Sequence, residues 1–326
     1  MYDHRRVTRE LSRRDAGREI LGRRSSSSRA SEALIADTTL GALASLGSAL
    51  MWAVTSILAR SLMPGMSSVA VNAIRSTIGG TILVVWVLAT AGAGAFTGAS
   101  VGAWVLLSLS IVVAIAIGDT VFLESTRALG LGRAMTISTT YPIGAAAIAA
   151  VFLDEPLTLP IVGGTILTLT GVTLILAPWA GHASEERFWF GVGTATLASV
   201  AWAVSTVLVK PPLAEMTPVT AQAIRLPLAA ALLWVTPWAR SAPRDLARSS
   251  RGARVRVVAL GALTAVSSVT FVAGVKYAGV TVASVLSATA PMFGIPLAFI
   301  FLNERLTYPA LLGAATTIAG IIVLHL

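Results

Sequence analysis

The chain of 326 residues lacks cysteine, holds three histidines and is only 12% charged. The absence of cysteine excludes a disulfide scaffold, a thiolate zinc site, an iron–sulfur cluster and a thiol enzyme. His4, His182 and His325 stand far apart without a second metal-binding residue at helical spacing, so we expect no metal and no cofactor. Soluble domains carry about 25% charged residues. The low charge therefore excludes an ordinary soluble domain.

Lysine is also scarce, and the residues that follow each lysine argue against ATP as an energy source. The only lysines, Lys210 and Lys276, are followed by Pro211 and Tyr277. A P-loop that binds ATP needs Gly-Lys-Ser/Thr, so the sequence argues against ATP-driven transport. The Ser/His, paired-Asp and His-rich constellations of an intramembrane enzyme are missing as well, so we predict that the chain is not an enzyme.

What the chain has in abundance is apolar sequence: 55% of its residues are hydrophobic and the mean hydropathy is +0.81. A helix needs about 20 mostly apolar residues to cross the roughly 30 Å hydrocarbon layer of a membrane. A stretch such as Val105 to Ile117 is apolar apart from Ser108 and Ser110, unlike the alternating strands of a membrane barrel. We therefore predict an all-α membrane protein with ten transmembrane helices. They span residues 39–59, 68–89, 102–127, 134–153, 159–177, 189–209, 219–239, 255–277, 280–302 and 309–326.

The net charge of +9 comes mainly from two arginine-rich blocks, residues 1–36 and residues 240–256. Both flank apolar runs, which is typical of membrane topology and argues against nucleic acid as a partner. The tail, 1–36, also has a serine run and too many acids for a transit peptide, so we expect a disordered cytosolic extension. The two blocks disagree about orientation, because ten spans place them on opposite faces. Charge alone favours a cytosolic 240–256 loop.

An internal repeat governs the predicted organisation. Shifted by about 150 residues, the chain aligns with itself around Trp52 and Trp202 and again at residues 72–75 and 222–225. We divide the chain into the tail, 1–36, a first repeat, 37–178, and a second repeat, 188–326. Each repeat holds five spans, an odd number, so the second must be inverted in the membrane. Inverted repeats are how many secondary transporters are built, with the substrate site where the halves meet.

Four residue types recur in the same order in both halves: a Trp in the first span, an Arg in the second, a Pro in the fourth and a Glu before the fifth. The pairs are Trp52/Trp202, Arg75/Arg225, Pro142/Pro291 and Glu155/Glu304. With this order the chain resembles the EamA-type transporters of the drug/metabolite transporter (DMT) superfamily. The missing glycine before each Glu departs from the family pattern. The resemblance implies a secondary transporter with both termini inside, often an exporter of amino acids, nucleosides or drugs.

Charged residues are costly inside a membrane and usually face a cavity or each other. At about 1.5 Å per residue, Arg75, Asp119 and Glu124 come out at similar depth, so Arg75 could pair with either carboxylate. Glu124 has a nearer partner in Arg127. Asp119 and Glu124 are the carboxylates suited to proton coupling. The alternative is a permanent ion pair that holds helices together.

The second half keeps the arginine but lacks these carboxylates, because Ser268 and Ala273 occupy their places. An unmatched guanidinium suits a substrate carboxylate or phosphate. Arg225 is therefore a candidate substrate-binding residue, as is Arg75. Alternatively, Arg225 reaches toward the membrane surface or binds carbonyls freed by Pro227.

Further candidate substrate-binding residues are Asn72, Gln222, Trp52, Trp202 and Tyr141. The amides supply hydrogen bonds and the aromatic rings supply flat faces, although tryptophan is also common at membrane interfaces. Proline in the fourth span of each half predicts a kink.

Glu155 and Glu304 lie in turns, and we interpret them as structural. Glycines in the fifth spans, such as Gly164 and Gly313, predict close helix packing or a homodimer face.

Together these features predict a secondary active exporter of small amino-acid-like, anionic or zwitterionic metabolites that works by alternating access with proton coupling. A channel or facilitator without ion coupling is the main alternative, and an intramembrane enzyme is a weaker one. Following the resemblance, we expect a plasma-membrane protein with both termini in the cytoplasm.

Overall fold

The fold comes from a computed structural model. It describes residues 35–63, 65–129, 131–176, 185–290, 292, 293, 297 and 308–324. The described residues form helices and turns and contain no strand, which confirms the all-α prediction. Residues 1–34 of the predicted tail, Pro291 and Glu304 lie outside the described residues.

The helices follow the predicted spans closely. The first repeat contains a first helix (Ile35–Leu62), then α2 (Ser68–Thr90), α3 (Gly94–Thr97), α4 (Val101–Ile111), η1 (Val112–Asp119), α5 (Thr120–Leu129), α6 (Leu131–Ser138), α7 (Tyr141–Phe152) and α8 (Leu159–Leu176). The second contains α9 (Glu185–Val209), η2 (Pro211–Ala214), α10 (Pro218–Val235), η3 (Pro237–Ala239), α11 (Ala242–Arg248), α12 (Arg251–Ala278), α13 (Val280–Ser287) and α15 (Tyr308–Val323). Among the described helices, six are long and apolar enough to cross a membrane unaided, and shorter apolar helices are consistent with the remaining spans.

Helices begin at equivalent hydroxyl caps in the two repeats. Ser67 accepts a 3.1 Å hydrogen bond from a backbone N–H in the first turn of α2, and Thr217 accepts one at the start of α10. Ser100 and Ser250 cap α4 and α12 in the same way, at 3.1 and 3.2 Å. A cap satisfies an N–H that has no partner within the helix. The repeat in sequence is thus a repeat in local structure.

Two predicted continuous helices are interrupted. The third span contains a π-helical segment, η1, between α4 and α5, whereas the corresponding stretch of α12 is α-helical. The fourth span breaks at Thr139 and Thr140 into α6 and α7, two residues before Pro142. Proline lacks the N–H that a continuous helix would use and is well tolerated in a first helical turn. The predicted kink is therefore a complete break.

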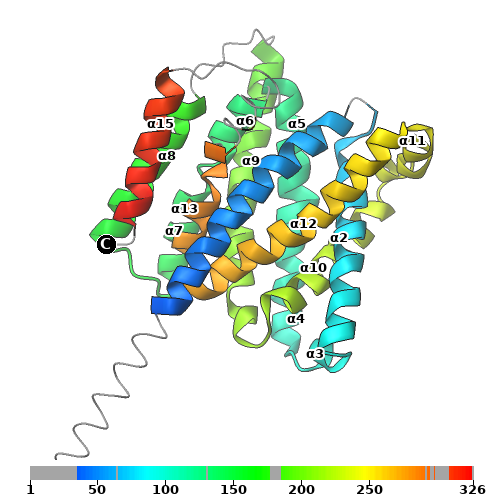
Figure 1. Ribbon diagram of the computed structural model, residues 1–326, viewed down its shortest axis with the longest axis horizontal. Coiled ribbons are helices and arrows are strands. Elements are labelled where there is room, and N and C mark those ends of the chain that lie inside the picture. The colour runs from blue at the N-terminus through cyan, green and yellow to red at the C-terminus, as the bar shows by residue number, and fades with distance from the viewer. Residues whose placement is uncertain are drawn as a thin grey trace, which may run out of the picture.

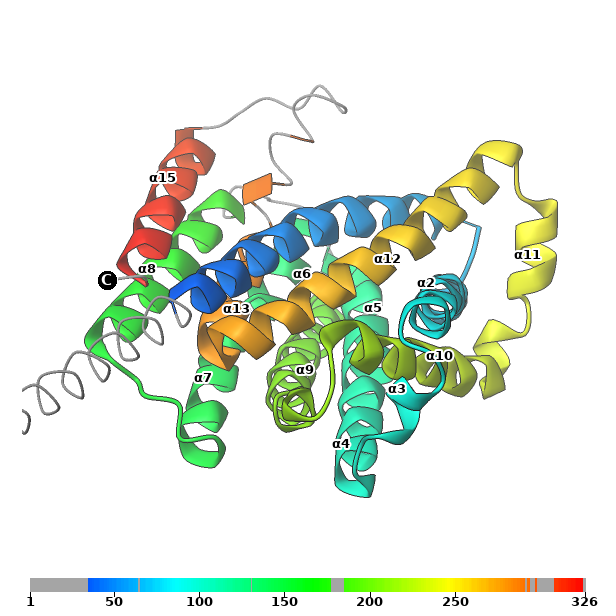
Figure 2. The ribbon, with the colours of Figure 1, turned by 60° about the horizontal axis from the view of Figure 1, so that its bottom comes forward.

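Equivalent helices of the two repeats pack against each other, α2 against α10 and α8 against α15. Such pairing is expected around an approximate two-fold axis. In Figures 1 and 2 the described chain forms a helical bundle with α15 and α8 side by side at one end and α11 at the other. We name the two faces after short helices: the α3 face, at the bottom of Figure 1, and the α11 face, at its top right.

Close helix crossings use glycines at equivalent positions. A Cβ on Gly41 would lie 2.8 Å from the Ala278 Cβ at the end of α12, and one on Gly191 would lie 2.5 Å from Leu129 Cγ at the end of α5. The first span of each repeat therefore crosses the third span of the other. The glycine rows of the fifth spans likewise meet inside the chain, because Gly164 of α8 faces Gly320 of α15.

Candidate functional site

A cavity of about 160 Å³ lies between the two repeats. Cavities of about 150 Å³ admit a molecule the size of benzene, whereas sites for drug-sized ligands begin near 300 Å³. This conformation therefore has room for a small metabolite. Seven of the nine residues singled out from the sequence line the cavity: Trp52, Arg75, Asp119, Tyr141, Trp202, Gln222 and Arg225.

Asp119 is held by both repeats. One carboxylate oxygen forms an ion pair with Arg75 of α2, and the other accepts a 2.8 Å hydrogen bond from the indole N–H of Trp202 in α9. The Arg75 and Asp119 side chains are only 10% and 17% exposed. Of the two partners that the sequence offered Arg75, the structure selects Asp119. Buried charges of this kind need a partner, because their desolvation is costly.

The π-helical segment sets the position of Asp119, which is its last residue. A π-helix widens the backbone and is frequent at functional sites. Gly118 lies directly under Trp202: a Cβ there would come within 2.8 Å of the indole Cδ1 and Nε1 atoms. The glycine therefore lets the indole approach the helix and reach the carboxylate.

Arg225 of α10 is 3% exposed and lines the cavity from the second repeat. Its terminal nitrogens donate hydrogen bonds to Gln222 Oε1 at 3.1 Å and to Ser205 Oγ at 3.2 Å. Its Nε has no partner within the described part of the chain. Burial argues against the alternative in which Arg225 reaches the membrane surface. Asp119 is near enough to interact with it electrostatically, but no carboxylate among the described residues forms an ion pair with it.

Aromatic rings pack beside this charge cluster. The Trp202 ring is 5.5 Å from Trp52, 5.2 Å from Phe122 and 6.0 Å from Tyr141, measured between ring centroids. Centroid distances of 4.5–7 Å with tilted or edge-to-face rings are typical of favourable aromatic contacts. The Tyr141 hydroxyl donates a 3.0 Å hydrogen bond to the Ser284 carbonyl of α13. Trp52 and Trp202 thus lie inside the bundle rather than at a membrane interface.

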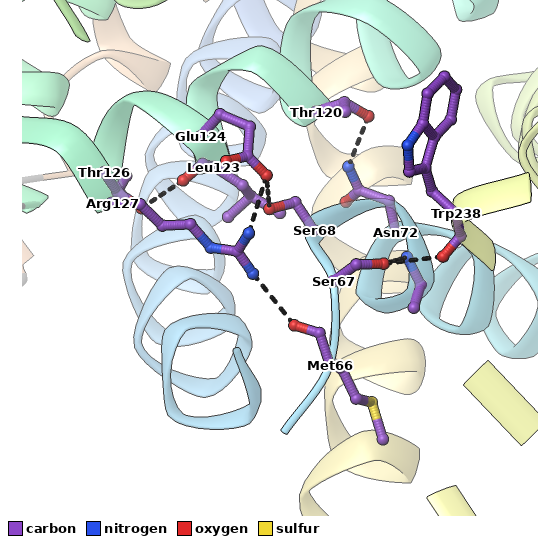
Figure 3. Close-up of polar contacts among 11 residues, drawn as sticks. Met66, Ser67, Ser68, Asn72, Thr120, Leu123, Glu124, Thr126, Arg127 and Trp238 are labelled. Atoms are coloured by element: carbon purple, nitrogen blue, oxygen red, sulfur yellow. Dashed lines mark hydrogen bonds and ion pairs between the residues drawn. The ribbon is translucent and has the colours of Figure 1, made fainter. Parts of the chain in front are cut away.

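The two remaining candidates do not line the cavity. Figure 3 shows Asn72 donating to the Thr120 hydroxyl, at 3.2 Å, and Glu124 close to Arg127 and Ser68. Glu124 pairs with Arg127 at 3.0 Å, as the sequence predicted, and accepts a 2.6 Å hydrogen bond from Ser68. Their predicted roles in substrate binding and proton coupling stay predictions.

The sequence reasoning missed the small polar residues of the cavity. Thr264, Ser267 and Ser268 line it from α12 together with the apolar Phe271, and Ser205 and Thr206 line it from α9. The four residues of α12 follow an i, i+3, i+4, i+7 pattern, which marks one face of a helix. Three hydroxyl residues on one helical face of an apolar span, Thr264, Ser267 and Ser268, were the signal that could have identified this lining.

Comparison with known proteins agrees with the fold and the repeat. The sequence model of the EamA-like transporter family matches residues 39–177 and again residues 189–326. The chain belongs to the EamA-like transporter family. Proteins of the EamA-like family are membrane transporters, so this chain is a multi-pass membrane protein of the DMT type.

One solved crystal structure of a protein is 21% identical to this EamA-like chain. The match covers 87% of this chain and 94% of the solved one, with a TM-score of 0.70. At this identity the likeness shows the fold alone. No curated protein sequence matches the chain.

Proposed function

We propose that this EamA-like protein is a secondary active exporter of small metabolites that carry a carboxylate or another anionic group, including amino-acid-like zwitterions. The observation that carries the proposal is a buried arginine in the cavity that forms no ion pair with any described carboxylate. Arg225 is buried, and its Nε has no hydrogen-bond partner within the described residues. A guanidinium offers a planar set of donors that matches a carboxylate.

The charge balance of the cavity supports an anionic group on the substrate. Two arginines, Arg75 and Arg225, line it, and Asp119 is the only carboxylate among the described lining residues. A single anionic group would neutralise the remaining positive charge. The volume of about 160 Å³ favours a small metabolite over a drug-sized molecule. The indole and phenol rings add apolar surface for the rest of such a substrate.

Asp119 is the group that we propose for proton coupling. Its carboxylate is shared between Arg75 of the first repeat and Trp202 of the second. Protonation would remove the charge that holds Arg75, which would free that arginine for an anionic substrate. A proton and a substrate anion would then compete for the same cation. The alternative is a permanent ion pair that only joins the repeats.

Counterflow in proteoliposomes tests the proposal. The panel contains amino acids, nucleosides, sugar phosphates and drugs, each assayed with and without a proton gradient. We expect saturable exchange of an anionic or zwitterionic compound, which a channel or facilitator without alternating access would not show. Arg225→Ala should reduce this exchange by about tenfold or more, because a charged hydrogen bond contributes roughly 1.5–3 kcal/mol. Arg248→Ala, at an exposed position in α11, is the matched control.

The proposed proton coupling and the proposed anionic substrate can be disproved independently of each other. If Asp119→Asn transported with an unchanged response to the proton gradient, coupling through Asp119 would be wrong. If Arg225→Ala left the exchange of every anionic and zwitterionic compound unchanged, the substrate class would be wrong. Uptake that never saturates would favour the channel.

For location, we propose the plasma membrane with both termini in the cytoplasm, as the family resemblance implies. Arginine counts oppose this orientation, because the exposed Arg240, Arg244 and Arg248 lie on the α11 face. Single cysteines at Ser28 and Ser249, labelled from each side, decide the matter, since the chain has no native cysteine. External labelling at residue 28 would overturn the proposed orientation. A homodimer stays a prediction.

A further inference from the structure

Two half-helices from different repeats lie between the cavity and the α3 face. Helix α7 begins at Tyr141, which lines the cavity, and ends at Phe152 near the turn 153–158. Helix α13 begins at Val280 and ends at Ser287, which also lines the cavity. The two helices pack against each other, as Figure 1 shows. Separation of these two half-helices is therefore one route by which the cavity can open toward the α3 face.

At the cavity end, the two half-helices are joined by the hydrogen bond from the Tyr141 hydroxyl to the Ser284 carbonyl. At the α3 face they are joined by Glu155. One carboxylate oxygen of Glu155 accepts from the Val280 N–H at 2.7 Å, and the other accepts from the Thr281 N–H at 3.1 Å and from its hydroxyl at 3.0 Å. A residue of the first repeat thus caps a helix of the second. The first N–H groups of a helix have no internal partner and attract negative charge.

Gly279, the residue before α13, has a backbone conformation that allows this contact. Gly279 has φ +87°, a conformation that favours glycine, and a Cβ there would lie 3.2 Å from the Glu155 carboxylate. The glycine therefore lets the turn between α12 and α13 present its N–H groups to the carboxylate. Sequence reasoning placed Glu155 in a structural turn of its own repeat, whereas its hydrogen bonds cross to the other repeat.

The surface that receives Glu155 is itself held together by two lysines. Lys210 donates to the carbonyls of Val275 and Lys276 at the end of α12, at 2.8 and 3.1 Å. Lys276 in turn donates to the Met216 carbonyl at 2.9 Å. The charges of Lys210 and Glu155 lie near enough to attract each other. Glu155 therefore joins the first repeat to the part of the second repeat that these lysine hydrogen bonds stabilise. It does so through hydrogen bonds and through electrostatic attraction to Lys210.

A second carboxylate crosses between the repeats at the same face. Glu215 of the second repeat accepts hydrogen bonds from the backbone N–H of Ser100, at 2.6 Å, and from its hydroxyl, at 2.8 Å. Ser100 is the cap of α4 in the first repeat. The Glu215 contact lies at the start of α4, a helix that continues into the wall of the cavity. Glu155 instead holds the start of α13, the half-helix whose other end lines the cavity. Of the two, Glu155 is the better placed to control access.

We propose that Glu155 is a gating residue of the transport cycle: the cavity opens to the α3 face when Glu155 releases the start of α13. The inference rests on the proposed function, because alternating access requires the inverted repeats to separate at one face at a time. Release of Glu155 exposes the first N–H groups of α13 to water, which replaces the lost hydrogen bonds. The hydrogen bond from Tyr141 to Ser284 then remains, and the two half-helices separate around this contact.

Cysteine accessibility tests the gate without any substrate. Ala288→Cys places a single thiol at the cavity, since Ala288 lines it and is 2% exposed. A membrane-impermeant maleimide is applied to intact cells and to inverted vesicles. Ser249→Cys, in a separate variant, shows which preparation exposes the α11 face. In this background Glu155→Gln should raise the labelling rate from the α3 face by about tenfold, because loss of a charged hydrogen bond shifts an equilibrium by about that factor.

Two further variants make the result specific. Thr281→Val removes only the hydroxyl contact, so it should raise labelling in the same direction by at least about twofold but by less than Glu155→Gln. Asp154→Asn is the matched control, because Asp154 is the exposed neighbouring carboxylate and asparagine also tolerates its positive φ. Labelling of this control should not change.

Two results would contradict the proposal that Glu155 is a gating residue. One is unchanged labelling from the α3 face in Glu155→Gln. The other is an equal rise from both faces together with a lower melting temperature, which would show that Glu155 only supports the fold. Because labelling needs no transported compound, the gate and the proposed export can fail independently: saturable counterflow with unaltered labelling would reject the gate alone.

Discussion

The indole N–H of Trp202 donates a 2.8 Å hydrogen bond to Asp119, so a residue of the second repeat holds the carboxylate that pairs with Arg75 in the first. The contact joins the two halves of the molecule at the wall of their shared cavity. A small change at this contact should therefore affect both the stability of the bundle and the charge of the site.

Trp202→Phe should lower the free energy of unfolding by about 0.6–1.7 kcal/mol, which lies between the average and the maximum found for side-chain hydrogen bonds within membranes. The phenyl ring keeps most of the contacts with Trp52 and Phe122 but cannot donate to Asp119. Trp52→Phe is the matched control, because the Trp52 ring packs in the same cluster and its indole N–H makes none of the described hydrogen bonds. Thermal unfolding in detergent measures both variants. Equal losses would show that ring size, rather than the hydrogen bond, determines the effect.

The buried pair Arg75 and Asp119 should show strong energetic coupling. Removing one partner leaves the other charge uncompensated in the bundle, whereas removing both does not. The summed losses of Arg75→Gln and Asp119→Asn should exceed the loss of the double variant by at least about 1 kcal/mol. Unfolding free energies of the four proteins give this value.

The exposed pair Glu124 and Arg127 supplies the comparison, since each side chain is 36% exposed. Exposed i, i+3 or i, i+4 ion pairs on a helix contribute about 0.2–0.5 kcal/mol. We expect the same comparison of single and double variants, made with Glu124→Gln and Arg127→Gln, to give a coupling free energy in that range. A larger coupling for this pair than for Arg75 and Asp119 would contradict the importance of burial.

Much of the site followed from the sequence, and the reasons are physical. Arg75 was predicted to pair with Asp119 or Glu124 because helix rise fixes the depth of each residue in a span. Arg225 was predicted to lack a carboxylate because the repeat places Ser268 where the first half has Asp119. Both arguments use only spacing along a helix, which sequence gives directly.

Other features depend on contacts that spacing alone does not specify. The π-helical segment shifts the face on which Asp119 lies, and no residue in the span marks it in advance. The choice of Glu155 as a cap for α13 depends on how the turn 153–158 meets the other repeat. Partners of this kind are set by tertiary packing, so the sequence predicted that Glu155 was in a turn but not what it would bind.

Glu215 should make stability depend on pH. The hydrogen bonds from Ser100 hold the pKa of the Glu215 carboxyl below its ordinary value, because they favour the charged form. A carboxyl with a lowered pKa contributes stability above its ordinary pKa, and this contribution is lost as pH falls below about 4.3. Glu215→Gln should therefore lose stability near neutral pH and show a weaker decline on acidification. Melting temperatures from neutral pH downward test this. An identical pH profile in both proteins would contradict the assignment.

Neighbouring glycines of α8 should respond in opposite ways to the same substitution. A Cβ on Gly164 would lie 2.7 Å from Leu324 Cγ and 2.9 Å from the Gly320 carbonyl oxygen, whereas a Cβ on Gly163 meets nothing within 4 Å. Gly164→Ala should therefore push α15 away and cost about 1–3 kcal/mol. Gly163→Ala should be neutral or stabilise α8 by up to about 1 kcal/mol, since alanine favours a helix.

Thermal unfolding of the two alanine variants in one detergent separates these outcomes, and light scattering of the same samples gives their oligomeric state. If the fifth spans use their glycines only for packing within the chain, Gly163→Ala leaves the molecular mass unchanged. A fall in mass for Gly163→Ala would instead show that the open side of α8 is the predicted homodimer face, because a methyl group there contacts nothing within one chain. Equal destabilisation by both variants would contradict the packing of α8 against α15.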